Sequence, residues 1–168
     1  MDLKNKELFL FDMDGTIYLD NDLICGALDT LNKIIKLKKK YIFLTNNSSK
    51  SKQDYLDKLK KLNIIVDETS VFTSGMAMGI YLNKFHPNKK IYLVGTSALE
   101  SELKKYNINL INDSNEEIAD VVVVGFDREL NYQKLEKACL YIDNGATFLA
   151  TNIDYVCPIK GKRYIPDL

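Results

Sequence analysis

The chain has 168 residues, of which 46% are hydrophobic and 27% charged, with 23 basic side chains against 23 acidic ones. This length is enough for one compact domain with a buried core, or for parts of two smaller lobes. Because the formal net charge is zero, nothing in the charge balance favours nucleic acid or an anionic membrane as a partner. No run approaches the roughly 20 apolar residues of a membrane-spanning helix. The N-terminus lacks the apolar stretch of a signal peptide, so we expect a cytoplasmic protein.

The chain alternates between short apolar runs and segments with helical periodicity. The apolar runs predict strands, the first of them buried on both faces, at residues 7–11, 41–44, 71–73, 90–94, 120–124 and 147–150. The periodic segments predict amphipathic helices at residues 26–37, 51–62, 76–85, 98–106 and 132–143. Strands that alternate with helices predict an α/β fold with a mostly parallel sheet.

Polar residues follow several of these strands directly. They occur at residues 12–16, 45–47, 125–127 and 151–154. Ligands of parallel α/β folds collect at the carboxyl ends of the strands. The sequence therefore predicts that its chemistry lies in these four segments.

The segment after the first strand reads Asp12-Met13-Asp14-Gly15-Thr16. Two carboxylates two residues apart in a turn can converge on one point, where one attacks phosphorus and the other transfers protons. Gly15 allows a sharp turn, and clustered carboxylate oxygens suit Mg²⁺. The simpler alternative is an ordinary acidic turn, because Asp-Gly pairs are common in turns.

These motifs resemble those of the haloacid dehalogenase superfamily of phosphatases. The stretch Leu-Phe-Leu-Phe-Asp-Met-Asp-Gly-Thr at residues 8–16 is similar to the first motif of that family, and Leu-Thr-Asn-Asn at residues 44–47 to the second. Segments 73–77, 94–95, 124–127 and 148–154 resemble the subclass IIA members, namely 4-nitrophenyl phosphatases, phosphoglycolate and pyridoxal phosphatases, and NagD-type nucleotidases. The resemblance runs over essentially the whole chain.

The resemblance implies roles for particular residues. Asp12 would be the nucleophile and a Mg²⁺ ligand, and Asp14 the general acid and base, with its backbone carbonyl also on the metal. Thr45, Asn46 and Asn47 would bind the phosphoryl group. Two interpretations remain open for Asn152, Asp154 and Asp127. These residues contact the substrate, or they have an ordinary structural role at the end of a strand.

The resemblance also implies two domains: part of a Rossmann-like parallel-sheet core over residues 1–74 and a type C2 α/β cap over residues 75–168. In this subclass a lysine motif and a Gly-Asp…Asp segment follow the cap, and neither is present in this sequence. We therefore expect an incomplete catalytic set. An isolated core of this kind would expose an open sheet edge and an apolar face, so we expect the chain to self-associate or to be marginally stable.

The predicted function is Mg²⁺-dependent hydrolysis of a small phosphorylated metabolite through a phospho-aspartyl intermediate. The resemblance implies a homodimer through the cap as a further partner. The alternative is a catalytically incomplete relic, or a module that binds phosphate and Mg²⁺ without turnover. A receiver-type phospho-acceptor domain is disfavoured, because its acceptor would follow a later strand than the first.

Overall fold

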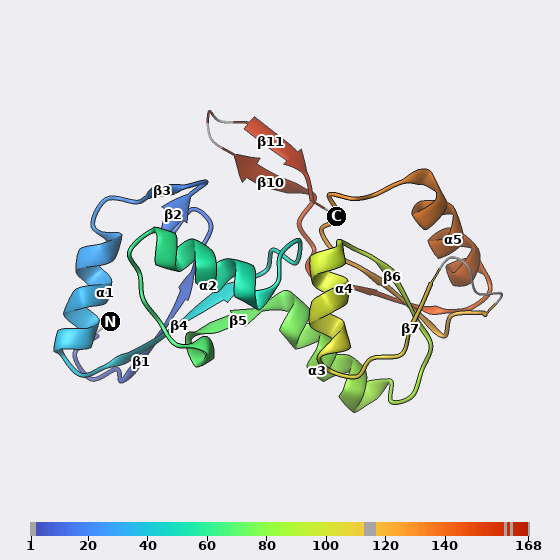
Figure 1. Cartoon of the computed structure of the whole chain (residues 1–168), viewed down its shortest axis with the longest axis horizontal. Helices are drawn as coiled ribbons and strands as arrows, with labels where there is room; N and C mark the ends of the chain where they lie inside the picture. Colours follow the sequence, from blue (N-terminus) through green and yellow to red (C-terminus); the bar gives the residue numbers. More distant parts are fainter. Residues whose placement is uncertain (1–2, 113–116, 160, 162, 168) are drawn as a thin grey trace. The chain divides into compact units, whose positions relative to one another are not determined.

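The computed structural model describes residues 3–112, 117–159, 161 and 163–167 (Figure 1). The chain forms two compact units. The first consists of Met1–Thr45, Lys52–Phe72 and Pro158–Tyr164. The second consists of Asn46–Ser51, Thr73–Cys157 and Ile165–Leu168. The expected division into a core over residues 1–74 and a cap over residues 75–168 stays a proposal.

The first unit contains a three-stranded sheet in the order β1-β4-β5. Strand β1 runs parallel to β4, with Leu8 opposite Lys40 and Asp12 opposite Leu44. A two-stranded antiparallel pair, β2-β3, follows the turn after β1. The elements of this unit are β1 (Leu8–Asp12), β2 (Tyr18–Leu19), β3 (Asp22–Leu23), α1 (Ala27–Lys36), β4 (Lys40–Thr45), α2 (Lys52–Lys61), the 3₁₀ turn η1 (Glu68–Ser70) and β5 (Val71–Thr73).

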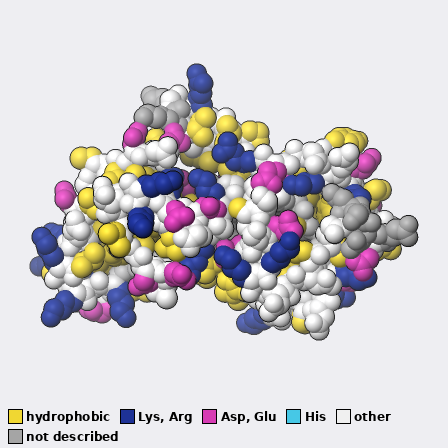
Figure 2. Space-filling model, in the orientation of Figure 1, with side chains coloured by type: hydrophobic (Ala, Val, Ile, Leu, Met, Phe, Trp, Pro, Cys, Tyr) yellow, Lys and Arg dark blue, Asp and Glu magenta, His cyan; other side chains and the backbone are white. Residues whose placement is uncertain are grey.

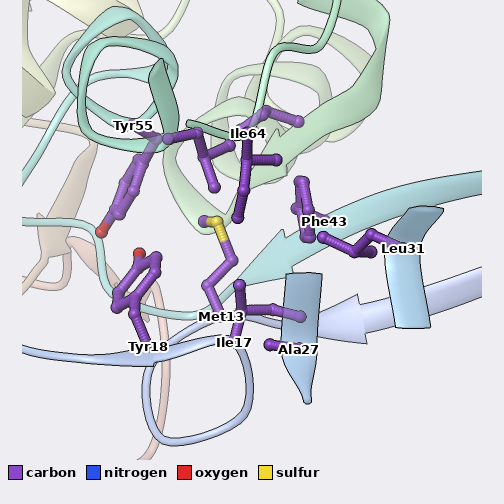
Figure 3. Close-up of a cluster of buried hydrophobic side chains, with 10 residues drawn as sticks. Met13, Ile17, Tyr18, Ala27, Leu31, Phe43, Tyr55 and Ile64 are labelled. Carbon is purple, nitrogen blue, oxygen red and sulfur yellow. The ribbon is translucent and has the colours of Figure 1, made fainter. Parts of the chain in front are cut away.

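The core of the first unit lies on one face of its sheet. Phe43 of β4, Leu31 of α1 and Tyr55 of α2 belong to one buried cluster (Figure 3). Because both helices contribute to this cluster, the other face of β1 is left open: Leu8 is 48% and Leu10 58% exposed. The expectation that the first strand is buried on both faces was therefore wrong.

The second unit contains a four-stranded sheet in the order β7-β6-β8-β9, in which every neighbouring pair is parallel. Strands β10 and β11 form a separate two-stranded sheet near the end of the chain. The elements are α3 (Ser74–Phe85), β6 (Ile91–Val94), α4 (Ser97–Lys104), β7 (Leu110–Ile111), β8 (Val121–Val124), α5 (Tyr132–Asp143) and β9 (Thr147–Ala150). The strands β10 (Val156–Ile159) and β11 (Arg163–Pro166) each have residues in both units.

Both faces of this second sheet are covered. Val121 and Val123 pack with Leu99 of α4 in one buried cluster, whereas Val122 packs with Ala138 of α5 in another. Successive side chains of a strand point to opposite faces, so the four-valine run serves both clusters. Central strands covered by helices on both sides read as continuous apolar runs, as the sequence of β8 does.

The fold confirms the predicted α/β class with parallel sheets. Each predicted strand and helix is present, with ends that differ by a few residues. Within the described ranges no helix combines the length and apolarity needed to cross a bilayer. Figure 2 shows basic and acidic side chains mixed over the visible face of the molecule.

Candidate active site

The turn after β1 is built around a buried methionine. Met13 is completely buried in the core of the first unit, and Figure 3 shows its side chain reaching in among the core residues. Its carbonyl oxygen accepts hydrogen bonds from the N–H groups of Thr16 (3.2 Å) and Ile17 (2.9 Å). Gly15 has a φ of 83°, a left-handed conformation that glycine adopts without strain. The core thus fixes the backbone between Asp12 and Asp14.

Asp12 ends β1 with an exposed side chain. The Thr16 hydroxyl donates to Asp12 Oδ2 over 3.2 Å, across the turn. This bond orients the carboxylate while leaving it accessible to solvent. An exposed and oriented carboxylate at a strand end is suited to attack an electrophile.

Asp14 faces a lysine that the sequence analysis did not single out. Asp14 Oδ1 lies 3.8 Å from the Nζ atom of Lys58 on α2. The same ammonium group lies 3.5 Å from the centroid of the Tyr18 ring. Burial above all, and then the nearby Asp14 carboxylate, raise the pKa of the Tyr18 hydroxyl well above its ordinary value. Tyr18 is therefore a neutral phenol at physiological pH.

Thr45 ends β4 and is buried. Since Asp12 is paired with Leu44 in the parallel register, Thr45 lies one residue further along at the same edge of the sheet. The structure thus brings Asp12, Asp14 and Thr45 to one strand edge of the first unit. This is the arrangement that the sequence predicted for these three residues.

Asn46 and Asn47 continue from Thr45 but belong to the second unit. The Asn47 Oδ1 atom accepts from the backbone N–H of Ser49 (3.0 Å) and from its hydroxyl (2.7 Å). Such a bond from a side chain to the backbone two residues on is a common way to stabilise a turn. Asn47 therefore has a structural role here, and its expected part in phosphate binding stays a prediction.

The side chains of Asn46, Asn152 and Asp154 come together within the second unit. Asn46 donates its amide to the Asp154 carboxylate, and Asn152 donates to the carbonyl oxygen of Asn46 over 3.2 Å. Asn152 also donates to Asp167 Oδ1 over 3.2 Å. Burial raises the pKa of the Asp167 carboxyl, an effect that the bond from Asn152 opposes. Asn152 and Asp154 follow Asn46 by 106 and 108 residues in the chain, yet their side chains form one hydrogen-bond network with it.

A second residue outside the predicted site anchors the loop after β4. Ser48 is completely buried, and its Oγ atom accepts from the backbone N–H of Phe126 (2.8 Å) and from the Thr151 hydroxyl (2.8 Å). The sequence signal for this contact was present, because Phe126 and Thr151 both lie in the polar segments that follow strands. Ser48 itself carries no pattern that separates it from the neighbouring Ser49.

Asp127 has a structural environment. Its side chain is only 3% exposed and pairs with the Lys134 ammonium group at 2.9 Å. It also accepts from the backbone N–H of Glu129 over 2.8 Å. A buried carboxylate with a cation and an N–H donor is satisfied without a ligand. Of the two interpretations left open for Asp127, the geometry favours the structural one.

The residues around the turn offer oxygen ligands to a cation. Asp12 and Asp14 are hard donors, and Mg²⁺ commonly uses one or two carboxylates together with water and substrate phosphate. Across the described part of the chain, no group of three or more histidine, cysteine, aspartate or glutamate side chains could hold a metal ion. Asp12 and Asp14 therefore suit a cation whose remaining ligands are water molecules and phosphate oxygens.

Residues 9–109 match the family model of the haloacid dehalogenase-like hydrolases. The chain belongs to this family. Its fold matches the NagD and 4-nitrophenylphosphatase members. It is 38% identical to the 4-nitrophenylphosphatase of Thermotoga maritima, with a TM-score of 0.87 over 96% of this chain and 60% of that one.

Two further proteins are similar to this chain. An acid sugar phosphatase of Staphylococcus epidermidis is 33% identical over 98% of this chain and 62% of its own length. The glycerol phosphate phosphatase of Mycobacterium tuberculosis, solved in complex with calcium, is 26% identical, with a TM-score of 0.83 over 95% of this chain and 46% of that one. The chain thus spans about three fifths of the length of the curated relatives that it matches.

Proposed function

We propose that this haloacid dehalogenase-like hydrolase acts on a small phosphorylated metabolite as a Mg²⁺-dependent phosphomonoesterase. The observation that carries the proposal is the turn after β1. Met13 is buried between Asp12 and Asp14, and Thr45 lies at the same strand edge as these two carboxylates. The names of the relatives support phosphate esters as the substrate class, because they include sugar, glycerol and 4-nitrophenyl phosphatases.

In the first chemical step a carboxylate oxygen of Asp12 attacks phosphorus, and the ester P–O bond breaks. Asp14 gives its proton to the departing oxygen, so the product is a neutral alcohol or phenol. The acyl phosphate on Asp12 holds the phosphoryl group covalently. The Thr45 hydroxyl would donate a hydrogen bond to a phosphoryl oxygen as charge shifts onto it.

In the second step water attacks phosphorus and gives its proton to Asp14. The bond between phosphorus and the Asp12 oxygen breaks, which releases inorganic phosphate and restores both side chains. The Asp12 carboxylate and the Asp14 backbone carbonyl would hold Mg²⁺, which when bound supplies positive charge to the phosphate oxygens. The two aspartates differ in their surroundings: Asp12 is exposed, whereas Asp14 faces Lys58.

The nucleophile is tested by the substitution Asp12→Asn. Asparagine keeps the size of the side chain but is a far weaker nucleophile, so we expect hydrolysis of 4-nitrophenyl phosphate with Mg²⁺ to fall about a thousandfold. Asp29→Asn, at an exposed carboxylate in the first turn of α1, is the matched control and should keep full activity. An Asp12→Asn variant that retains more than about a tenth of the rate would refute this assignment.

The second candidate function is binding of phosphate and Mg²⁺ without turnover. Beryllium fluoride with Mg²⁺, which imitates a phosphoryl group on an aspartate, separates the two functions. A thermal shift that needs Asp12, in a chain that hydrolyses no phosphate ester, would favour the binding module.

A further inference from the structure

We propose that Lys58 is a positioning residue that holds the Asp14 carboxylate in place for proton transfer. The inference rests on the function proposed above. Lys58 Nζ lies 3.8 Å from Asp14 Oδ1, and the side chain of Lys58 is only 15% exposed. The ammonium group also lies over the Tyr18 ring, 3.5 Å from its centroid. The lysine is therefore held between an anion and an aromatic face.

The position of Lys58 on its helix explains this burial. Tyr55 and Leu59, on the same side of α2, are 1% and 0% exposed and belong to the core of the first unit. Lys58 lies three residues after Tyr55, so its aliphatic stem runs along the core-facing side of the helix. Lys60 and Lys61, in the last turn of α2, are exposed. Lys58 thus differs from the ordinary solvated lysines of this helix.

A lysine ammonium group in this environment needs electrostatic compensation. Withdrawing a cation from water is costly unless other charges or dipoles replace the lost hydration. The Asp14 carboxylate and the negative face of the Tyr18 ring provide this compensation. The positions of Asp14 and Tyr18, in the segment after β1, and of Lys58 on α2 therefore depend on one another.

The turn itself fixes the aromatic part of this arrangement. The backbone N–H of Gly15 donates to the carbonyl oxygen of Tyr18 over 2.8 Å, and the Tyr18 N–H donates to Met13 over 3.3 Å. Tyr18 is wholly buried. The turn that carries Asp14 therefore also builds the surface on which Lys58 rests, and Lys58 in turn restricts the rotation of the Asp14 carboxylate.

The chemistry of the leaving group tests this role. An alkoxide leaves poorly and needs the proton from Asp14, whereas 4-nitrophenolate is a stable anion that leaves with little protonation. If Lys58 positions Asp14, Lys58→Met lowers kcat/KM for an alkyl phosphate such as glycerol phosphate about 10- to 100-fold more than for 4-nitrophenyl phosphate. Lys58→Arg, which keeps the charge, restores part of the alkyl phosphate activity. Lys61→Met, at an exposed lysine of the same helix, changes neither rate.

A purely structural role of Lys58 would lower the two rates by the same factor, and that result would overturn the proposal. Rates that do not change for either ester would overturn it as well.

A second measurement does not depend on turnover. Urea unfolding of the 168-residue chain with Asp14→Asn, Lys58→Met and both substitutions forms a double-mutant cycle. We expect the effects of the two substitutions to be non-additive, and additive effects overturn the proposal. If the unaltered chain hydrolyses neither ester, the proposed function fails, while the cycle still decides whether Lys58 holds Asp14.

Discussion

Asp120, directly before β8 in the second unit, accepts two hydrogen bonds from Lys89 and Lys90. Its Oδ2 atom accepts from the backbone N–H of Lys90 over 2.8 Å, and its Oδ1 atom lies 3.1 Å from Lys89 Nζ. The backbone bond, followed by the bond from the Lys89 side chain, lowers the pKa of this carboxyl below its ordinary value. Both bonds favour the ionised form.

This lowered pKa makes stability depend on pH in a defined direction. The folded chain binds the Asp120 proton less tightly than the unfolded chain, so the contribution is fully present above the ordinary aspartate pKa and is lost as the pH falls through the lowered one. We expect Asp120→Asn to lower the urea midpoint at about pH 7 but not at about pH 2. Glu136→Gln, at an exposed position of α5, is the control. A deficit of equal size at both pH values would contradict this explanation.

The candidate site shows which residues the sequence can identify. Asp12, Asp14 and Thr45 follow predicted strands, and the parallel sheet necessarily brings such positions to one edge. Lys58 could not be found in this way, because its importance comes from a helix packing beside the turn. A lysine among four others on and around the same helix has no distinguishing pattern until the helix is placed against Tyr18.

Two helices of the second unit begin with side-chain caps that differ in their surroundings. The Thr96 hydroxyl accepts from the backbone N–H of Leu99 at the start of α4, and the same hydroxyl donates to the carbonyl oxygen of Ser49 over 3.1 Å. Asn131 caps α5 by accepting from Lys134. Thr96 is buried and Asn131 exposed, so the first cap has an additional role in packing.

These two caps give a paired prediction. Asn131→Ala should lower the free energy of unfolding by about 1 kcal/mol, the usual effect of losing a helix cap. Thr96→Ala should lower it by about 2 kcal/mol, because the Ser49 carbonyl also loses its donor in a buried place. Thr96→Ser, which keeps the hydroxyl, should lose less than half as much. Chemical denaturation of the three variants is the measurement, and equal losses for the two alanine variants would argue against the bond to Ser49.

The length of each helix or strand decided whether it could be predicted from the sequence. The long periodic helices and the apolar strands β1, β4, β6, β8 and β9 were found at nearly their observed positions. Strands β2, β3 and β7 have two residues each, too few to show an alternating pattern. Strand β10 contains Pro158, which lacks the N–H needed within a sheet and is found in edge strands. Its two-stranded sheet supplies such an edge.

At the scale of the whole molecule, the uncovered face of the first sheet has consequences for solubility. Leu8 and Leu10 of β1 are half-exposed or more, and Phe72 of β5 is 36% exposed. Ile65, which lines the same surface hollow as Leu8, is 85% exposed. Contiguous apolar surface of this kind is uncommon on monomeric proteins. It is the face that the sequence analysis expected to cause self-association.

We expect the 168-residue chain to sediment partly as oligomers, and Leu10→Glu to shift it toward the monomer. The substitution places a charge on the exposed apolar face, where association would desolvate it. Leu130→Glu, at a leucine that is 53% exposed in the second unit, is the matched control and should leave the oligomers in place. Analytical ultracentrifugation over a range of concentrations is the measurement. A chain that stays monomeric throughout would show that this face does not associate.

Met13 joins the architecture of the first unit to its chemistry. Its side chain is fully buried among core residues, while the aspartates on either side carry the proposed reaction. In a laboratory evolution experiment that selects for phosphatase activity, this position would tolerate almost as little variation as the aspartates, although it touches no substrate. Selection would also remove variants that repack the core around Phe43 or Ile64, because they move the backbone between the two carboxylates. Selection for catalysis would therefore act on the hydrophobic core as well.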